Sequence, residues 1–269
     1  MKKFAVIGSP ISHSLSPQIH TIFAEQNNVQ ISYEAIEVEE KDFATKVDYL
    51  FKDGYSGLNI TLPLKEAAYS YSESTSERAA LSESVNTLCF RGESIFGDTT
   101  DGQGLLNDFE EKEIIVKDSK VILIGAGGSA KAILPSLISA KPKSICLINR
   151  TYKNAEFLER KYQSTFPNIK ALEVESELNE DADIVINSAS AGVLQEELVL
   201  PKNIFGPESK VYDLSYSKKE TPFNSYAKKL GVNEIYDGLG MLVQQAALSF
   251  EIWNEFKPNT QKIEQKLRA

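Results

Sequence analysis

Lys65 closes a stretch whose residue types and spacing could carry out proton transfer. In Asn59-Ile60-Thr61-Leu62-Pro63-Leu64-Lys65, apolar and polar side chains alternate up to the proline. Such alternation predicts a strand with one apolar face, and Pro63 suits the first turn of a following helix. A lysine in that turn lies near the positive end of the helix dipole, which favours the neutral amine and suits it to acid–base catalysis. A half-buried strand followed by an ordinary surface lysine is the alternative.

A carboxylate stands at the start of a second expected helix, in Thr100-Asp101-Gly102-Gln103-Gly104. Asp101 could simply cap that helix. It could also pair with Lys65 and hold the amine in a fixed orientation, which would complete a catalytic pair. The two roles are compatible.

Two serines surround the first expected helix start, in Ser12-His13-Ser14-Leu15-Ser16-Pro17. Ser16 is predicted to be the N-cap and Pro17 the first helical residue. Capping alone explains Ser16 and leaves the hydroxyl of Ser14 without a role. A helix N-terminus with a spare hydroxyl can bind an anion, here a substrate carboxylate.

A glycine-rich turn, Gly125-Ala126-Gly127-Gly128-Ser129-Ala130, follows the apolar run 121–124 and precedes a helical pattern. It has the form G-x-G-x-x-A. The first glycine makes the turn, the second admits a pyrophosphate, and the small last residue packs the helix on the strand. A plain turn is the alternative, but the strand–turn–helix context favours a dinucleotide site.

Asn149-Arg150-Thr151 ends the next expected strand. An NAD site usually carries Asp or Glu there, as acceptor for the ribose 2′-hydroxyl. An amide, a guanidinium and a hydroxyl suit a 2′-phosphate instead. The sequence therefore favours NADP over NAD; an arginine that is merely solvated at a strand end is the alternative.

Short runs rich in Val and Ile alternate along the chain with helical patterns. This alternation predicts an α/β fold with parallel sheets, whose strands and helices would position the residues named above. The expected strands are residues 4–8, 32–38, 57–62, 85–90, 94–99, 120–125, 144–149, 169–174, 183–188, 210–215 and 234–236. The expected helices are residues 17–26, 42–52, 103–111, 129–139, 154–162 and the C-terminal stretch 240–268. A charged, polar segment within residues 101–119 predicts a break between two sheets.

Composition limits the class of protein. The 269 residues are 42% hydrophobic and 25% charged, which is typical of a globular chain of one or two domains. A net charge of −9 and a pI of about 5.0 argue against a nucleic-acid partner. The two cysteines and two histidines have no ligand-like spacing, so we expect neither a disulfide framework nor a metal site. We find no signal-peptide core or membrane span and expect a cytoplasmic protein.

Several short motifs, taken in order, resemble those of the shikimate dehydrogenase family. They are Ser14-Leu15-Ser16-Pro17, the stretch from Asn59 to Lys65, Val85-Asn86-Thr87, Thr100-Asp101-Gly102, Gly125-Ala126-Gly127-Gly128, Asn149-Arg150-Thr151 and Gly240-Met241-Leu242-Val243-Gln244-Gln245-Ala246-Ala247. The resemblance extends from Phe4 to about Trp253. The order and spacing of the motifs are more specific than any one of them.

The resemblance implies a two-domain α/β fold. It predicts an N-terminal α/β substrate domain of residues 1–101 and 239–269 and a Rossmann-like, doubly wound NADP-binding domain of residues 102–238, with a cleft between them. The implied reaction is the reversible, NADPH-dependent reduction of 3-dehydroshikimate to shikimate in aromatic amino acid biosynthesis. The implied partners are small molecules, without nucleic acid, membrane or metal, and the implied state is a monomer or homodimer.

The resemblance also implies roles for single residues. Lys65 and Asp101 would be the catalytic pair. The substrate would be held by Ser14, Ser16, Asn59, Thr61, Asn86, Tyr216 and Gln245. NADP(H) would contact Gly125, Ala126, Gly127, Gly128, Ser129, Ala130, Asn149, Arg150, Thr151, Leu214, Gly238 and Met241.

A few positions depart from the family pattern. They are Thr99, where the family often has Asn; Ser84, where it often has Ala; Ala189, where it often has Thr; and Lys218, where it often has Pro. Ala189 removes a hydroxyl from a cofactor loop, and no departure falls on the Lys65–Asp101 pair. Three other interpretations remain: a quinate/shikimate dehydrogenase that also uses NAD, a non-catalytic NADP-binding regulator on the same fold, and an unrelated two-domain Rossmann reductase.

Overall fold

The computed structural model describes residues 1–92, 94–176, 181–189, 200 and 203–269, and these form two compact units. One unit comprises Met1–Leu105 and Leu242–Ala269, and the other comprises Leu106–Met241. The first boundary falls inside helix α5 (Asp101–Glu111) and the second inside helix α9 (Leu239–Asn254). The chain therefore passes from one unit to the other through a helix each time.

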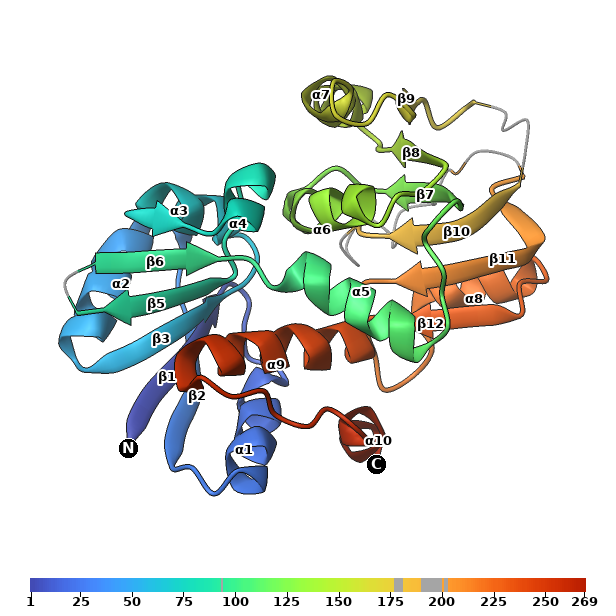
Figure 1. The fold of residues 1–269 in the computed structure, drawn as a ribbon. Helices are drawn as coiled ribbons and strands as arrows, with labels where there is room; N and C mark the ends of the chain where they lie inside the picture. Colours follow the sequence, from blue (N-terminus) through green and yellow to red (C-terminus); the bar gives the residue numbers. More distant parts are fainter. Residues whose placement is uncertain (93, 177–180, 190–199, 201–202) are drawn as a thin grey trace. The chain divides into compact units, whose positions relative to one another are not determined.

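The first unit is built on a sheet with the strand order β2-β1-β3-β5-β6-β4 (Figure 1). Its strands are β1 (Lys2–Gly8), β2 (Ile31–Glu37), β3 (Tyr55–Ile60), β4 (Ser74–Thr75), β5 (Thr87–Arg91) and β6 (Ser94–Asp98). Besides parts of α5 and α9, its helices are α1 (Ser16–Gln26), the 3-10 helix η1 (Glu40–Asp42), α2 (Phe43–Lys52), α3 (Lys65–Tyr71), α4 (Glu77–Ser82) and α10 (Ile263–Arg268).

The first sheet is mixed rather than parallel. β1 pairs in parallel with β2 and β3, whereas β5 is antiparallel to both β3 and β6. The expectation of parallel sheets is therefore wrong for β5, whereas β6 pairs in parallel with β4. Only two residues separate β5 from β6, and so short a connection can close a hairpin but cannot make the crossover that parallel strands require.

Apolar side chains cover both faces of the first sheet. Ala5 and Ile7 of β1 belong to a buried cluster with Val47 of α2. Phe4 points to the opposite face and stacks on Trp253 of α9, with the ring centroids 4.6 Å apart. The period-two alternation of β1 thus attaches the N-terminal strand to the C-terminal helix α9.

The second unit contains a wholly parallel sheet with the strand order β12-β11-β10-β7-β8-β9. Its strands are β7 (Lys120–Ile124), β8 (Ser144–Ile148), β9 (Ile169–Leu172), β10 (Ala182–Asn187), β11 (Phe205–Asp213) and β12 (Glu234–Asp237), and its own helices are α6 (Gly128–Ser139), α7 (Tyr152–Tyr162) and α8 (Pro222–Lys229). This is the doubly wound Rossmann order, in which the direction of winding reverses between β7 and β10. The predicted fold class is confirmed.

Most expected elements agree with the structure within a few residues, but three further expectations are wrong. Pro63 does not open a helix: it lies in the turn after β3, and Lys65 is the first residue of α3. Leu62, expected on the apolar face, lies beyond the strand and is 55% exposed. The stretch 240–268 is not one helix, because α9 ends at Asn254, Glu255 has a positive φ, and Pro258 cannot donate a backbone hydrogen bond.

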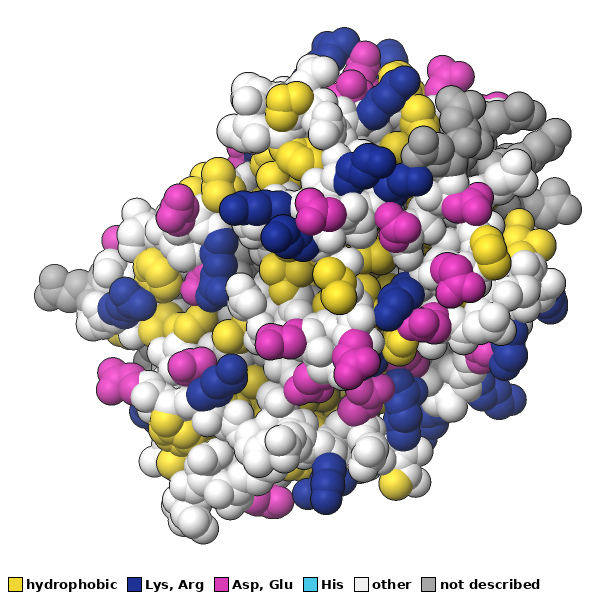
Figure 2. Space-filling model, turned by 45° about the vertical axis from the view of Figure 1, so that its right-hand side comes forward, with side chains coloured by type: hydrophobic (Ala, Val, Ile, Leu, Met, Phe, Trp, Pro, Cys, Tyr) yellow, Lys and Arg dark blue, Asp and Glu magenta, His cyan; other side chains and the backbone are white. Residues whose placement is uncertain are grey.

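Charged side chains of both signs are intermixed on the face that Figure 2 shows. Within the described part of the chain, no helix is long and apolar enough to cross a membrane. Cys89 and Cys146 are both free thiols.

Candidate active site

Lys65 and Asp101 form an ion pair between the first residues of two helices, α3 and α5. The Lys65 Nζ lies 2.7 Å from the Asp101 Oδ2, and the two side chains are 16% and 8% exposed. The other carboxylate oxygen, Oδ1, accepts a hydrogen bond of 2.9 Å from the Asn86 amide. Both oxygens of Asp101 are therefore held, and an ammonium group is placed at a fixed point beside it. This arrangement can deliver a proton to a bound ligand and take it back.

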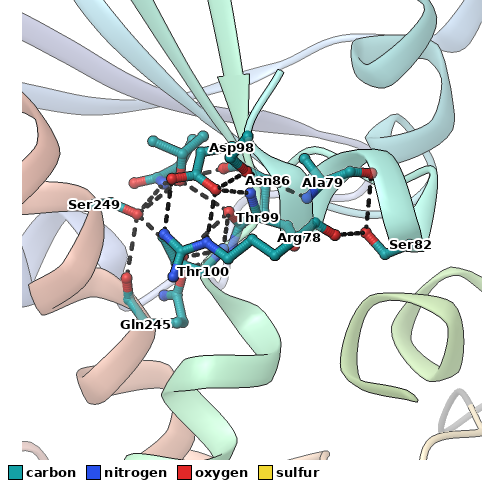
Figure 3. A network of polar contacts seen from close by, with 12 residues as sticks. Arg78, Ala79, Ser82, Asn86, Asp98, Thr99, Thr100, Gln245 and Ser249 are labelled. Atoms are coloured by element: carbon teal, nitrogen blue, oxygen red, sulfur yellow. Dashed lines mark hydrogen bonds and ion pairs between the residues drawn. The ribbon is translucent and has the colours of Figure 1, made fainter. Parts of the chain in front are cut away.

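Asn86 lies at the centre of a buried polar network and is 2% exposed (Figure 3). Its Oδ1 accepts from the Thr100 backbone amide at 2.9 Å. A backbone N–H can only donate, so this contact fixes which end of the side-chain amide is which. The Nδ2 group then points to acceptors, the Asp101 Oδ1 and the Gln245 Oε1 at 3.2 Å.

An ion pair anchors the segment that precedes Asp101. Arg78 of α4 makes a bidentate contact with the buried Asp98 carboxylate, with both N···O distances 2.7 Å (Figure 3). The same carboxylate accepts from the Thr99 backbone amide at 2.7 Å. The hydroxyl of Thr99, one of the departures from the family pattern, is buried without a partner among the described residues.

Asn59 lies behind this network and uses its hydrogen-bonding groups within the protein. Its Oδ1 accepts from the Tyr33 hydroxyl at 2.7 Å, and its Nδ2 lies 2.9 Å from the Ser249 Oγ and 3.1 Å from the Asn86 carbonyl. Burial raises the pKa of the Tyr33 phenol, which keeps that group a hydrogen-bond donor. The contact of Asn59 with a substrate remains a prediction.

The two serines at α1 differ from the expected capping arrangement. The N-cap of α1 is Leu15, and Ser16 is its first residue. The Ser14 Oγ accepts from the Ser16 backbone amide at 3.3 Å, so Ser14, not Ser16, satisfies a free amide of the first turn. The N-cap prediction for Ser16 is wrong because the helix begins one residue earlier than Pro17 suggested. The Ser16 side chain is buried.

The other predicted substrate residues are distributed over both units. Thr61 follows β3 directly and is half-buried; its backbone amide donates to the Ile7 carbonyl at 2.9 Å. Gln245 of α9 is 9% exposed, and a Cβ added to Gly104 of α5 would lie 2.7 Å from its Cβ, so the two helices touch at this point within the first unit. Tyr216 is half-buried in the second unit, after β11.

The glycine-rich turn between β7 and α6 forms an open backbone cradle. Gly125 has φ +101°, and a Cβ there would lie 2.5 Å from the Ser188 Oγ. A Cβ on Gly127 or Gly128 would meet nothing within 4 Å. The backbone conformation and the nearby Ser188 therefore explain why residue 125 is a glycine. Packing gives no such reason for Gly127 or Gly128. The buried Ala130 packs in the first turn of α6, and half-buried Ser129 precedes it.

Asn149 joins this turn to the end of β8. Its Oδ1 accepts from the Ala126 backbone amide at 3.2 Å, and its Nδ2 donates to the Thr151 carbonyl at 2.9 Å. Arg150 and Thr151 are exposed beside it, and the first turn of α7 carries no acidic residue. The Asn149 side chain thus holds the turn in place, and Arg150 and Thr151 lie exposed next to it.

The three remaining predicted cofactor residues lie near the ends of β11 and β12. The Leu214 backbone amide donates to the Asn187 carbonyl at 2.8 Å, and a Cβ on Gly238 would lie 2.0 Å from the Leu214 carbonyl oxygen. The Met241 amide donates to the buried Tyr212 hydroxyl at 3.3 Å, and that hydroxyl donates to the Asp108 Oδ2 at 2.6 Å. Close backbone contacts therefore fix Leu214 and Gly238, and a buried phenol fixes Met241. Ser190, also in the expected loop motif, lies outside the described residues.

Sequence reasoning gave no role to Tyr33, Thr87 or Ser249, which the structure joins to the network. Ser249 lies one turn after Gln245 on α9, so helical spacing could have placed the two on one face. Tyr33 reaches Asn59 through the pairing of β2, β1 and β3, which no local pattern reveals.

Sequence profiles of one family match most of the chain. The shikimate dehydrogenase substrate binding domain matches residues 6–88, the shikimate / quinate 5-dehydrogenase profile matches residues 109–203, and the shikimate 5′-dehydrogenase C-terminal domain matches residues 238–268. A relative from Psychromonas ingrahamii, called shikimate dehydrogenase (NADP(+)), is 43% identical over 269 residues, which cover 100% of this chain and 98% of the relative.

Solved structures of similar proteins agree over the whole chain. The Ael1 enzyme from Pseudomonas putida has a TM-score of 0.91 at 34% identity, covering 99% of this chain and 98% of that one. Shikimate 5-dehydrogenase from Thermus thermophilus, in complex with NADP(H) and shikimate, has a TM-score of 0.88 at 29% identity, covering 100% of both chains.

Proposed function

The chain belongs to the shikimate dehydrogenase family, and from this premise we propose that it catalyses the NADPH-dependent, reversible reduction of 3-dehydroshikimate to shikimate. The observation that carries the proposal is the Lys65–Asp101 pair, 2.7 Å apart with both carboxylate oxygens held. A ketone reduction needs a hydride for the carbon and a proton for the oxygen. The chain offers a fixed, positively charged amine for the second.

NADPH, when bound, supplies the hydride. The Lys65 Nζ donates a proton to the substrate oxygen in the direction of reduction and accepts it in the reverse direction. Asp101 keeps the amine oriented and balances its charge when it is protonated.

The substrate is proposed to bind to side chains of the first unit. Ser14 and Ser16, at the start of α1, would hold the carboxylate, where backbone amides of a helix N-terminus favour negative charge. Asn59, Thr61, Asn86 and Gln245 would hold ring hydroxyls, and Tyr216 would lie beside the carboxylate. These assignments are supported by the polar network around Asn86 and by the family motifs.

NADP is proposed to bind the second unit at the turn after β7. The chain fits the group, since Gly127 and Gly128 leave room where any Cβ would stand and their glycine identity has no other explanation in the packing. Arg150 and Thr151 would take the 2′-phosphate, and Leu214, Gly238 and Met241 would lie by the nicotinamide. The domains would then be residues 1–101 with 239–269 for the substrate and residues 102–238 for NADP.

The predicted place of action is the cytoplasm, and the predicted state is a monomer or a homodimer. Free thiols at Cys89 and Cys146 accord with a reducing compartment.

The test is a set of assays on the purified chain that follow NADPH absorbance. We expect rapid oxidation of NADPH with 3-dehydroshikimate, a much lower kcat/KM with NADH, and little reaction with dehydroquinate. Comparable rates with NADH and dehydroquinate would establish the quinate/shikimate alternative. An NADPH-binding chain without turnover of either substrate would establish the non-catalytic regulator.

A further inference from the structure

We infer that Thr87 and Ser249 form a buried hydroxyl pair that positions Asn86 for catalysis, an inference that rests on the proposed function. Thr87 is the first residue of β5 and Ser249 lies in α9; both are 0% exposed. Their hydroxyl oxygens are 2.8 Å apart. They are positioning residues, since the contacts that define them are to other side chains of the site.

Thr87 acts directly on the Asn86 side chain. Its hydroxyl donates to the Asn86 Oδ1 at 2.8 Å, the same oxygen that accepts from the Thr100 amide. These contacts lie on the carbonyl end of the amide, while Asp101 and Gln245 lie on the nitrogen end. A rotation of Asn86 about its last bond would break contacts at both ends.

Ser249 ties this arrangement to other segments of the first unit (Figure 3). Its Oγ lies 2.9 Å from the Asn59 Nδ2 of β3, 3.3 Å from the Thr100 Oγ1 and 3.1 Å from the Gln245 carbonyl oxygen. A serine that only bonds back to the preceding turn of its helix adds no stability to the helix. The Ser249 hydroxyl also contacts Asn59, Thr87 and Thr100, so it connects α9 to three other segments of the first unit.

The proton count makes each hydroxyl depend on the other. A hydroxyl has one proton and two acceptor positions. Because the Thr87 proton is used in the hydrogen bond to the Asn86 Oδ1, the bond between the two hydroxyls requires Ser249 to donate its proton to Thr87. The Ser249 oxygen then accepts from the Asn59 amide, and removing either hydroxyl leaves buried polar groups with one partner fewer.

The consequence reaches the catalytic pair through one side chain. Asn86 holds the Asp101 Oδ1, and the Asp101 Oδ2 holds the Lys65 Nζ. A shift of Asn86 therefore moves the carboxylate that orients the amine. Catalysis is sensitive to displacements of an ångström or less, so a loss at Thr87 should lower kcat although neither hydroxyl contacts the Lys65–Asp101 pair.

The test uses four single variants of the full chain, assayed with NADPH and 3-dehydroshikimate. Thr87→Val removes the hydroxyl at nearly constant volume, Thr87→Ser keeps it, and Ser249→Ala removes one oxygen from α9. The matched control is Ser82→Ala. Ser82 is 1% exposed in the same unit, and its hydroxyl bonds to the nearby carbonyls of Arg78, Ala79 and Ser84.

We expect kcat to fall about 10- to 100-fold in Thr87→Val and in Ser249→Ala, while the KM for NADPH stays unchanged. Thr87→Ser should recover most of the wild-type kcat. Ser82→Ala should lower the melting temperature without changing kcat. The double variant Thr87→Val/Ser249→Ala should be no slower than the slower single one, because the two hydroxyls act as a unit.

Wild-type kcat in folded Thr87→Val and Ser249→Ala would overturn the inference, and so would an equal loss in Ser82→Ala. Should Thr87→Val fail to fold, Ser249→Ala decides alone. A wild-type chain that does not reduce 3-dehydroshikimate would reject the proposed function itself, which is a different result from an active enzyme indifferent to Thr87.

Discussion

The polar network of the first unit and the glycine-rich turn of the second are built on opposite principles. In the network, Asn59 donates to the Asn86 carbonyl, the Asn86 amide donates to Asp101, and Asp101 forms an ion pair with Lys65. In the turn, Gly127 and Gly128 offer backbone and empty space. The side chains of the network satisfy one another, whereas the turn exposes backbone groups because Gly127 and Gly128 have no side chains.

The difference determines how each site should respond to mutation. A network of buried side chains loses its geometry when one member is removed, because the partner is left unsatisfied. A backbone cradle keeps its donors whatever the side chains are and fails mainly when volume is added. Loss of a single polar side chain in the first unit should therefore lower kcat strongly. Cofactor affinity should fall when a larger side chain is added to the turn of the second unit or when a charge beside it is removed.

The largest expected effect is at the catalytic pair. Lys65→Ala should lower kcat by about 10²- to 10⁴-fold, because it removes the group that exchanges a proton with the substrate. The KM for NADPH should hardly change. The double variant with Asp101→Asn should be little worse than the worse single one. Steady-state kinetics of the three variants measure this, and near-normal turnover in Lys65→Ala would contradict it.

The second expected effect is on cofactor choice. Arg150→Ala should weaken NADP by roughly 10- to 150-fold, because a charge-assisted contact to a phosphate contributes about 1.5–3 kcal/mol. NAD lacks the phosphate and should be unaffected. Comparison of kcat/KM for NADPH and NADH in both proteins tests this, and an equal loss with the two cofactors would refute the assignment of Arg150.

A smaller effect is expected in the glycine-rich turn, where substitutions of Gly127 and Gly125 should have different consequences. Gly127→Val should raise the KM for NADPH about tenfold, the equivalent of one good hydrogen bond, with only the small loss of stability expected when valine replaces glycine at the N-cap of α6. Its backbone, at φ −86° and ψ −167°, is extended and suits valine. Gly125→Ala should lower the melting temperature as well, because of its positive φ and the nearby Ser188 Oγ. Equal loss of stability in both variants would count against an open cradle at Gly127.

The last expected effect is on stability in acid and not on catalysis or cofactor binding. Burial lowers the pKa of His20 to about 3, and neither ring nitrogen has a partner among the described residues. The unfolded chain takes up a proton near pH 6.5 that the folded chain rejects, so stability falls as pH decreases from 6.5 towards 3, by about 1.4 kcal/mol per pH unit. His20→Phe should flatten this dependence in denaturant unfolding measured at several pH values. Parallel curves for the two proteins would exclude His20 as the cause.

The sequence predicted local elements better than contacts between distant residues. The glycine-rich turn and the alternation of strands with helices follow from local patterns, so the second unit was largely predictable. Lys65 and Asp101 could be paired only as a hypothesis, since a contact across 36 residues depends on packing. Ser249 reaches Asn59 across 190 residues, and no local pattern encodes such a contact.

The N-cap at Ser16 and the helix start at Pro63 were wrong for a related reason. Proline restricts the local backbone but does not fix the residue at which the first hydrogen-bonded turn closes, and that residue depends on the sheet to which the helix is attached. The antiparallel strands of the first sheet were missed because apolar alternation gives no strand direction.

The most direct test of the central claim, that side chains of the first unit recognise shikimate and backbone of the second recognises NADP, is a pair of shikimate titrations. Shikimate is titrated calorimetrically into the cofactor-free wild type and into Gly127→Val. The account predicts the same dissociation constant for shikimate in both, while the variant binds NADPH more weakly. Loss of shikimate binding in Gly127→Val to the same degree as NADPH binding would contradict it.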